Sequence, residues 1–237
     1  MKKAILVGGL SLATLILMQP AVSADVNYTS NASINFITNT DPTAPVDPTN
    51  PNNPFTPDNP AQAGTSGPLS IDFASSLDFG SQKITSINQT YYAALTKGKD
   101  STGTEKSVPN YVQVTDNTGT SQGWSLKVTQ VDDFKNGTKS LTGASLTFGS
   151  GNVLTATGSD AGRPTTTANY TLVKGVEQSV TTAAQAAGQG TWVTRYGNDS
   201  TDGARTVSLY VPGASMKQTG AYTTTLRWTL AQTPVSN

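Results

Sequence analysis

The sequence contains neither histidine nor cysteine, which removes most of the chemistry that enzymes and metal sites use. Without histidine the chain lacks the commonest general base and the commonest metal ligand. Without cysteine it has no thiolate nucleophile, no thiolate metal site and no disulfide, so its stability must come from a packed core. No nucleophile motif and no phosphate-binding glycine motif is present either. We therefore expect no enzymatic activity, no metal and no cofactor.

Charged residues are also scarce, at 13% of the chain, with 15 basic and 15 acidic side chains. Such a chain has no basic field to attract nucleic acid or anionic lipid. Threonine, serine, asparagine and glycine fill the polar positions instead, which is typical of β-rich extracellular proteins. We expect no nucleic-acid partner.

Two small groups of carboxylates deserve a chemical interpretation. Asp132 and Asp133 are adjacent, and adjacent strand residues point to opposite faces, so we interpret them as part of a solvated loop rather than as a catalytic pair. Asp199 and Asp202 lie near Asn198 and resemble a calcium loop only loosely, because the regular ligand spacing and the terminal Glu are missing. A turn is the preferred interpretation there.

The first 24 residues have the layout of a secretory signal peptide. Lys2 and Lys3 precede an apolar run from Ala4 to Met18, and Val22-Ser23-Ala24 offers the small residues of a cleavage site. The run is too short to span a membrane comfortably. We expect residues 1–24 to be removed, with no membrane insertion afterwards. No lipid-accepting Cys and no Leu-Pro-x-Thr-Gly motif follows, so we expect no covalent attachment to the wall.

Seven prolines recur at every third position within residues 41–60. This period matches the three residues per turn of polyproline II, which predicts a semi-rigid extended strut. Asp, Asn and Thr fill the gaps, which favours a solvated spacer over a docking ligand for a proline-reading groove. We expect residues 41–68 to be a proline-rich surface loop or linker.

Residues 32–36 alternate between apolar and polar side chains, so residues 25–40 are expected to form an N-terminal strand segment. If this strand pairs with the sheet of residues 69–237, the proline segment is a loop within one domain. If it does not, the whole N-terminal part is a flexible arm. The alternation favours pairing, and a paired strand can be exchanged with a neighbouring molecule.

From Leu69 onward, short alternating runs are separated by Gly-rich and Asn-rich turns. This pattern predicts an all-β fold, an antiparallel β-sandwich with Greek-key-like connections. Residues 177–187 alone favour a helix, weakly, through four alanines. The predicted strands occupy residues 69–73, 77–79, 110–115, 123–131, 146–148, 170–172, 192–196, 207–211 and 222–230.

The tripeptide Trp-x-Leu occurs twice on these strands, as Trp124-Ser125-Leu126 and as Trp228-Thr229-Leu230. Each Trp lies on the apolar face of an alternating strand, so packing in the core is the plain interpretation. Stacking on wall sugars or on a partner protein is the functional alternative. If any tryptophan is an exposed contact, we expect it to be Trp192, because its alternation is weaker and it lies between Gly190 and Gly197.

The two motifs belong to a longer resemblance, to the WxL-domain surface proteins of low-GC Gram-positive bacteria. Similar blocks follow one another along the chain in the family's order. At Thr118-Gly119 the sequence departs from the family, whose members often carry Arg before this Gly. The matching blocks are Leu77–Gly80, Val114–Asp116 with Gly119, Gly123–Val128, Leu141–Leu146, Thr191–Gly197, Val211–Pro212 and Thr225–Leu230.

The resemblance implies a non-catalytic protein at the cell surface that attaches non-covalently to the Gram-positive cell wall. Its implied partners are peptidoglycan or a wall-associated polymer, and companion surface proteins encoded alongside. Trp124, Leu126, Trp228 and Leu230 are then the family motif, either structural or wall-binding. A lectin-like glycan-binding or adhesin module is the alternative function.

Overall fold

A computed structural model describes residues 25–58, 60, 62–155 and 161–232. The signal peptide expected at residues 1–24 lies outside the described residues. The chain divides into two units, one ending at Phe36 and one beginning at Ile37. In the first unit, residues 25–36 are extended and have no secondary structure. In the second unit the regular secondary structure of the described residues is all antiparallel β apart from one helical turn, which confirms the predicted all-β, sandwich-like fold.

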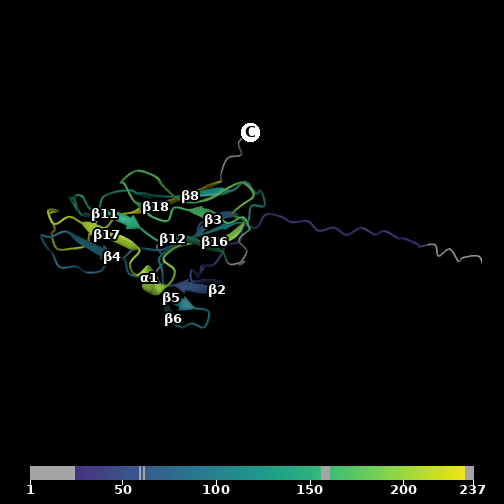
Figure 1. The fold of residues 1–237 in the computed structure, drawn as a ribbon, viewed down its shortest axis with the longest axis horizontal. Coiled ribbons are helices and arrows are strands. Elements are labelled where there is room, and N and C mark those ends of the chain that lie inside the picture. The colour runs from purple at the N-terminus through teal and green to yellow at the C-terminus, as the bar shows by residue number, and fades with distance from the viewer. Residues whose placement is uncertain (1–24, 59, 61, 156–160, 233–237) are drawn as a thin grey trace, which may run out of the picture. The chain divides into compact units, whose positions relative to one another are not determined.

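Four four-stranded sheets make up the second unit, and each is named here by its most distinctive residues (Figure 1). The proline sheet has the order β1-β2-β5-β6, the central sheet β12-β16-β7-β3, the tryptophan sheet β13-β15-β8-β18 and the tyrosine sheet β14-β11-β17-β4. β9 and β10 form a separate hairpin.

The elements run in chain order as follows: β1 Val46–Asp47, β2 Asn50–Pro57, β3 Leu69–Ala74, β4 Gln89–Tyr92, β5 Thr96–Asp100, β6 Glu105–Val108, β7 Tyr111–Asp116, β8 Trp124–Gln130, β9 Lys135–Asn136, β10 Lys139–Ser140, β11 Ser145–Phe148, β12 Gly151–Thr155, β13 Thr165–Thr166, β14 Tyr170–Thr171, β15 Gln178–Ala183, β16 Gly190–Tyr196, α1 Ser200–Gly203, β17 Val207–Val211 and β18 Leu226–Gln232.

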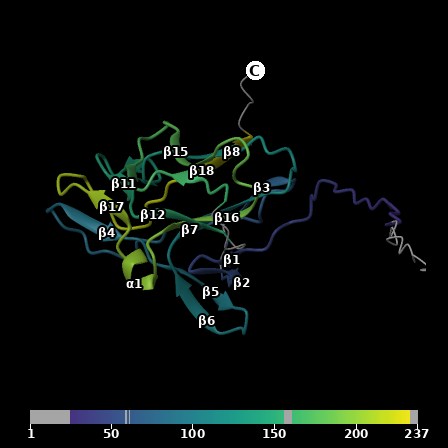
Figure 2. The same ribbon diagram turned by 45° about the vertical axis from the view of Figure 1, so that its right-hand side comes forward.

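The central sheet is covered on both faces, and its strand β7 is buried along its whole length. On one face Val112 and Val114 join the main core, which the tryptophan and tyrosine sheets complete. On the other face Tyr111 packs in a second core against the proline sheet, together with Phe55 and Val108. In Figure 2 β7 lies between β18 on one side and β5 on the other.

The proline segment does not form the expected polyproline strut over residues 46–57, because these residues are strands β1 and β2 joined by a turn at 48–49. Proline is compatible with extended backbone, and the free N–H groups between the rings supply the bonds. The N–H of Phe55 donates to the Pro45 carbonyl at 3.1 Å, and that of Asp58 to the Lys97 carbonyl at 3.0 Å. Phe55 is only 2% exposed, so its burial in the second core fastens the segment to the domain.

Two other local predictions are wrong in the structure. Residues 32–36 form no strand, and Ile34 and Phe36 are 78% and 84% exposed. The helix expected at 177–187 is instead strand β15, because pairing with β8 buries Val180 and Ala183 on the core side. Tertiary pairing thus overrides the helical preference of the alanines.

Candidate functional site

The two Trp-x-Leu motifs face each other in one antiparallel ladder of the tryptophan sheet. Leu126 of β8 lies directly opposite Leu230 of β18. Antiparallel ladders have local two-fold symmetry about each residue pair. The axis through this leucine pair relates Trp124 to Trp228. The sequence shows the repeat, and the structure shows that the two copies are partners.

The two motifs nevertheless have unequal environments. Trp124 and Leu126 are 1% and 0% exposed, and the Trp124 indole N–H donates to the Gly188 carbonyl at 2.9 Å. Gly188 has a φ of +78°, and a Cβ there would lie 2.5 Å from Trp124 Nε1, so the ring requires a glycine at this position. Trp228 and Leu230 are only partly buried, because β18 is the edge strand of its sheet.

Trp192, the candidate for an exposed contact in the sequence, is buried in the structure. Its side chain is 3% exposed, and its indole N–H donates to the Gln189 carbonyl at 2.9 Å. Strand β16, which carries it, lies in the interior of the central sheet between β12 and β7. An interior strand leaves its inward side chains no route to solvent, although the flanking glycines gave the sequence an edge-like appearance.

An open cleft of about 1390 Å³ runs beside β18. One wall is β3 with the stretch that follows it to Ile84, and the other is the stretch from Lys217 through the first residues of β18. The floor is apolar, with Leu146, Leu209 and Val211 from the inner face of the tyrosine sheet. Both Trp228 and the block Leu77–Gly80 line this cleft, so two parts of the family resemblance meet there.

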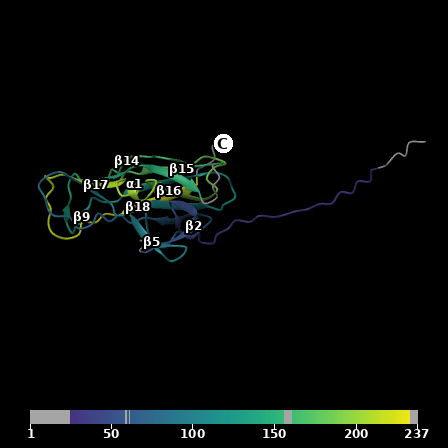
Figure 3. The same cartoon turned by 60° about the horizontal axis from the view of Figure 1, so that its bottom comes forward.

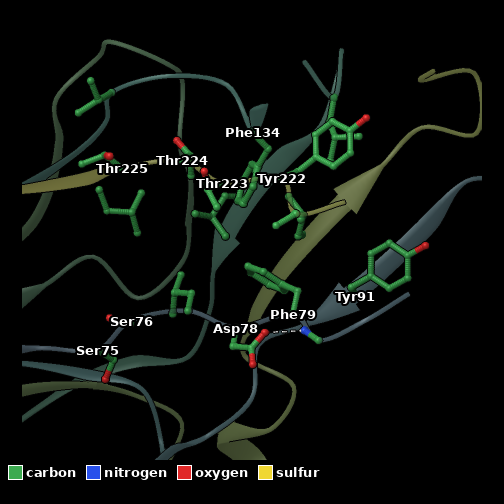
Figure 4. A pocket seen from close by; sticks show the side chains of 18 of the residues that line it. Ser75, Ser76, Asp78, Phe79, Tyr91, Phe134, Tyr222, Thr223, Thr224 and Thr225 are labelled. Carbon is green, nitrogen blue, oxygen red and sulfur yellow. Dashed lines mark hydrogen bonds between the residues drawn. The ribbon is translucent and has the colours of Figure 1, made fainter. Parts of the chain in front are cut away.

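Side chains sort by type along the cleft (Figure 4). Aromatic rings gather at one end, where Phe79 and Phe134 pack edge to face with centroids 6.2 Å apart and Tyr91 and Tyr222 lie beside them. Serine and threonine hydroxyls lie at the other end, from Ser75 and its neighbours and from Thr225. Sequence analysis missed this grouping, since the aromatic residues come from four separate segments of the chain.

The outer face of the tyrosine sheet forms a second candidate surface, called here the tyrosine face. On this face seven residues of paired strands lie side by side, and none of them is charged. Tyr92 and Tyr210, 50% and 37% exposed, project from neighbouring strands, and Tyr92 is paired with Ser208 while Tyr210 is paired with Thr90. Hydroxyls fill the rest of the face. Its members are Thr90, Tyr92, Ser145, Thr147, Thr171, Ser208 and Tyr210.

Alternation places the tyrosine face outward, because the intervening residues of each strand are core residues. Leu209 and Leu146, for example, are 5% and 1% exposed on the inner side. The adjacent pair Tyr91-Tyr92 was the available sequence signal, since one ring of such a pair must point outward if the segment is a strand. In Figure 3, β14 and β17 of this sheet lie to the left of β15.

The carboxylates do not converge. Lys135 donates to Asp132 at 2.8 Å and holds the pKa of that carboxyl below its ordinary value, while Asp133 binds Lys174 and raises the pKa of that amine. Asp199 caps α1 by accepting from the Asp202 N–H at 2.8 Å.

One more carboxylate, Asp72, is buried in a hydrogen-bonded site without a cation. It accepts from Ser70, Gln113 and Thr115, and burial raises its pKa. Within residues 25–232, as far as the structure describes them, no three acidic side chains gather as a metal site. In the same residues no helix is long and apolar enough to cross a membrane.

Comparison with known proteins gives one result that covers almost the whole chain. A family model described as the WxL domain, a surface cell wall-binding domain, matches residues 23–234. No curated protein and no solved structure matches the chain. The buried and the half-buried Trp-x-Leu strands are thus the motif pair of a recognised domain, and the chain belongs to the WxL family of cell-surface, cell wall-binding proteins.

Proposed function

We propose that this protein is exported, attaches non-covalently to the peptidoglycan of a Gram-positive cell wall without catalysing a reaction, and assembles there with companion surface proteins. The family assignment supports wall binding at the cell surface. The layout of the first 24 residues supports export, and the resemblance to proteins of low-GC Gram-positive bacteria supports the kind of wall.

The tyrosine face is the observation that supports a glycan ligand. A tyrosine ring presents an apolar surface with a polar tip, which suits the C–H face of a sugar and its hydroxyls. The hydroxyls around the two rings can both donate and accept, as sugar hydroxyls do. An open sheet face without charge also fits a long, stiff polysaccharide better than a small ligand, which prefers a concave pocket.

The cleft beside β18 is a poorer place for a glycan strand. Over its aliphatic floor, sugar hydroxyls would lose water without gaining hydrogen bonds, and the hydroxyls of Ser75, Thr225 and their neighbours are available only at one end of the cleft. Absence of catalysis is supported by the separation of Asp132, Asp133 and Asp199, which have their own lysine or capping roles, and by the lack of histidine and cysteine.

The test is cosedimentation of the exported protein with intact Gram-positive cells and with peptidoglycan stripped of protein and teichoic acid. We expect retention on both, and a loss of roughly 30-fold in affinity for the variant Tyr92→Ala/Tyr210→Ala, from about 1 kcal/mol per stacked ring. Tyr28→Ala is the matched control, because Tyr28 is 93% exposed outside this face.

Other outcomes of this experiment argue against the proposal. Binding to cells but not to stripped peptidoglycan would show that the receptor is a surface protein or an accessory polymer of the wall. Binding to neither, with binding to soluble or host glycans instead, would favour the lectin-like or adhesin alternative, which the same tyrosine face suits. Release of soluble sugars from the wall by the purified protein would contradict the absence of catalysis.

A further inference from the structure

The tyrosine face is longer across its strands than along them. Its sheet has the order β14-β11-β17-β4, and Figures 1 and 2 show β11, β17 and β4 following one another in that order. Neighbouring strands lie about 4.8 Å apart, so the sheet spans about 14 Å from β14 to β4. Along any one strand the face has at most two positions, about 7 Å apart. A chain molecule that covers the whole face must therefore cross the strands.

Backbone pairing arranges the residues of the tyrosine face in two rows that run perpendicular to the strands. In each row every residue lies directly opposite the next one on the neighbouring strand. Each strand presents one residue from each row, except β14, which presents a residue of the first row only. The first row is Tyr92, Ser208, Thr147 and Thr171, and the second row is Thr90, Tyr210 and Ser145.

The two tyrosines lie in different rows. On β4 the ring is in the first row and the hydroxyl of Thr90 in the second, whereas on β17 Ser208 is in the first row and Tyr210 in the second. Successive rings of a β-1,4-linked glycan are rotated by a half-turn about the chain axis, so the edge that faces one row in one ring faces the other row in the next. The reversal from β4 to β17 matches this alternation. The strand spacing is also close to the length of one pyranose ring with its glycosidic oxygen.

Strands β11 and β14 continue the face with hydroxyls alone. The hydroxyls of Thr147 and Thr171 lie 2.8 Å apart and hydrogen-bond each other, which leaves one donor and further acceptor positions for a ligand. Ser145 and Thr147 are partly buried and Thr171 is exposed. Such a surface can bond sugar hydroxyls or acetamido groups, but it offers no opposite charge to a carboxylate or a phosphate. It therefore fits the uncharged glycan backbone of peptidoglycan better than the stem peptides or a teichoic acid.

We propose that the tyrosine face holds one β-1,4-linked glycan chain across its strands, with one sugar ring over each of β4, β17, β11 and β14. The first two rings stack on Tyr92 and Tyr210, and the next two bond to the hydroxyls of Ser145, Thr147 and Thr171. This inference rests on the wall binding proposed above, and it adds the direction of the chain, its linkage and the length of the site.

NMR titration of isotope-labelled exported protein with β-1,4-linked oligomers of N-acetylglucosamine tests the length and the direction. An oligomer of two rings should shift the backbone amide signals of β4 and β17 only, because the tyrosines supply the stacking. An oligomer of four rings should also shift the signals of β11 and β14. The affinity should rise from two rings to four and then stay level up to six.

The linkage is tested with two tetrasaccharides of glucose, the β-1,4-linked cellotetraose and the α-1,4-linked maltotetraose. Maltotetraose lacks the half-turn between rings, so it can stack on one tyrosine only. It should bind roughly tenfold more weakly than cellotetraose, the effect of losing one stacked ring.

The variant Thr147→Ala/Thr171→Ala tests the hydroxyl half of the site. It removes both partners of one hydrogen bond, so no buried group is left unpaired. Binding of the four-ring oligomer should weaken by roughly tenfold, whereas binding of the two-ring oligomer should not change. Thr165→Ala/Thr229→Ala is the matched control, because both threonines are exposed on strands of the tryptophan sheet, and it should change neither affinity.

Three results would overturn the proposal. Equal affinity for two and four rings, with shifts confined to β4 and β17, would show that the chain does not cross the sheet. Equal affinity for cellotetraose and maltotetraose would contradict the match to the half-turn. Absence of any shift on the tyrosine face, in a protein that still sediments with stripped peptidoglycan, would show that the wall binds elsewhere. Loss of that sedimentation would instead refute the proposed wall attachment itself.

Discussion

Replacing each motif tryptophan by alanine tests whether the two Trp-x-Leu strands are energetically equivalent. Trp124 is 1% exposed and its indole N–H satisfies the Gly188 carbonyl. Truncation of a buried aromatic destabilises by about 3–5 kcal/mol, and the unpaired carbonyl adds about 1 kcal/mol. For Trp228, which is half-buried at an open cleft, no closed cavity forms, and we expect about 2 kcal/mol.

Urea denaturation followed by far-ultraviolet circular dichroism measures these losses without relying on tryptophan fluorescence. If the unfolding free energy falls by about 2.5 kcal/mol per molar urea, Trp124→Ala should lower the unfolding midpoint by roughly 2 M and Trp228→Ala by roughly 0.8 M. Trp192→Ala is the matched control and should resemble Trp124→Ala, since Trp192 is 3% exposed. Equal losses for Trp124 and Trp228 would refute the assignment of β18 to an uncovered edge.

Three further changes probe other parts of the fold. Gly98→Ala places a Cβ 2.3 Å from the Thr56 carbonyl oxygen and 2.6 Å from the Phe55 ring, so hydrogen exchange should accelerate in β2, and unchanged exchange there would contradict the packing described. Tyr196→Phe leaves the buried Tyr170 hydroxyl without its 2.5 Å partner and should lower the unfolding free energy by about 1–3 kcal/mol in urea titrations; a loss near zero would argue against that bond. Burial raises the pKa of Asp72, so its stabilising contribution is complete below the unfolded value of about 3.9 and is lost as pH rises through the higher folded value. Asp72→Asn should therefore gain stability relative to the unaltered protein between pH 3 and pH 7, and parallel pH profiles would refute this.

Strands with one buried face were predictable from the sequence. Alternation gave residues 207–211 the same bounds as β17 and placed β8 within one residue at each end. It was less informative for β7, where both faces are buried and apolar and polar residues alike lie inside. The prediction of a polyproline strut was wrong for a different reason. Its three-residue period describes the backbone conformation of an isolated chain, whereas the single large apolar residue Phe55 decides where the segment packs.

The candidate surfaces were harder to predict than the motif. The repeated Trp-x-Leu pattern identified the family and the strands, but burial depends on which strand lies next to each copy. Trp192 illustrates this, because its strand neighbours β12 and β7 come from distant parts of the sequence. The tyrosine face combines four strands, and the cleft combines segments more than a hundred residues apart, so neither has a local sequence signature.

The full burial of β7 has a consequence for how the domain opens. Tyr111 holds one core and its neighbours Val112 and Val114 hold the other, so neither core can lose its packing without exposing the same strand. Local unfolding free energies for the two layers should then approach the global value. A protein displayed outside the cell meets proteases that cleave transiently opened segments, and coupling through one shared strand leaves the domain no half-open state for them to attack.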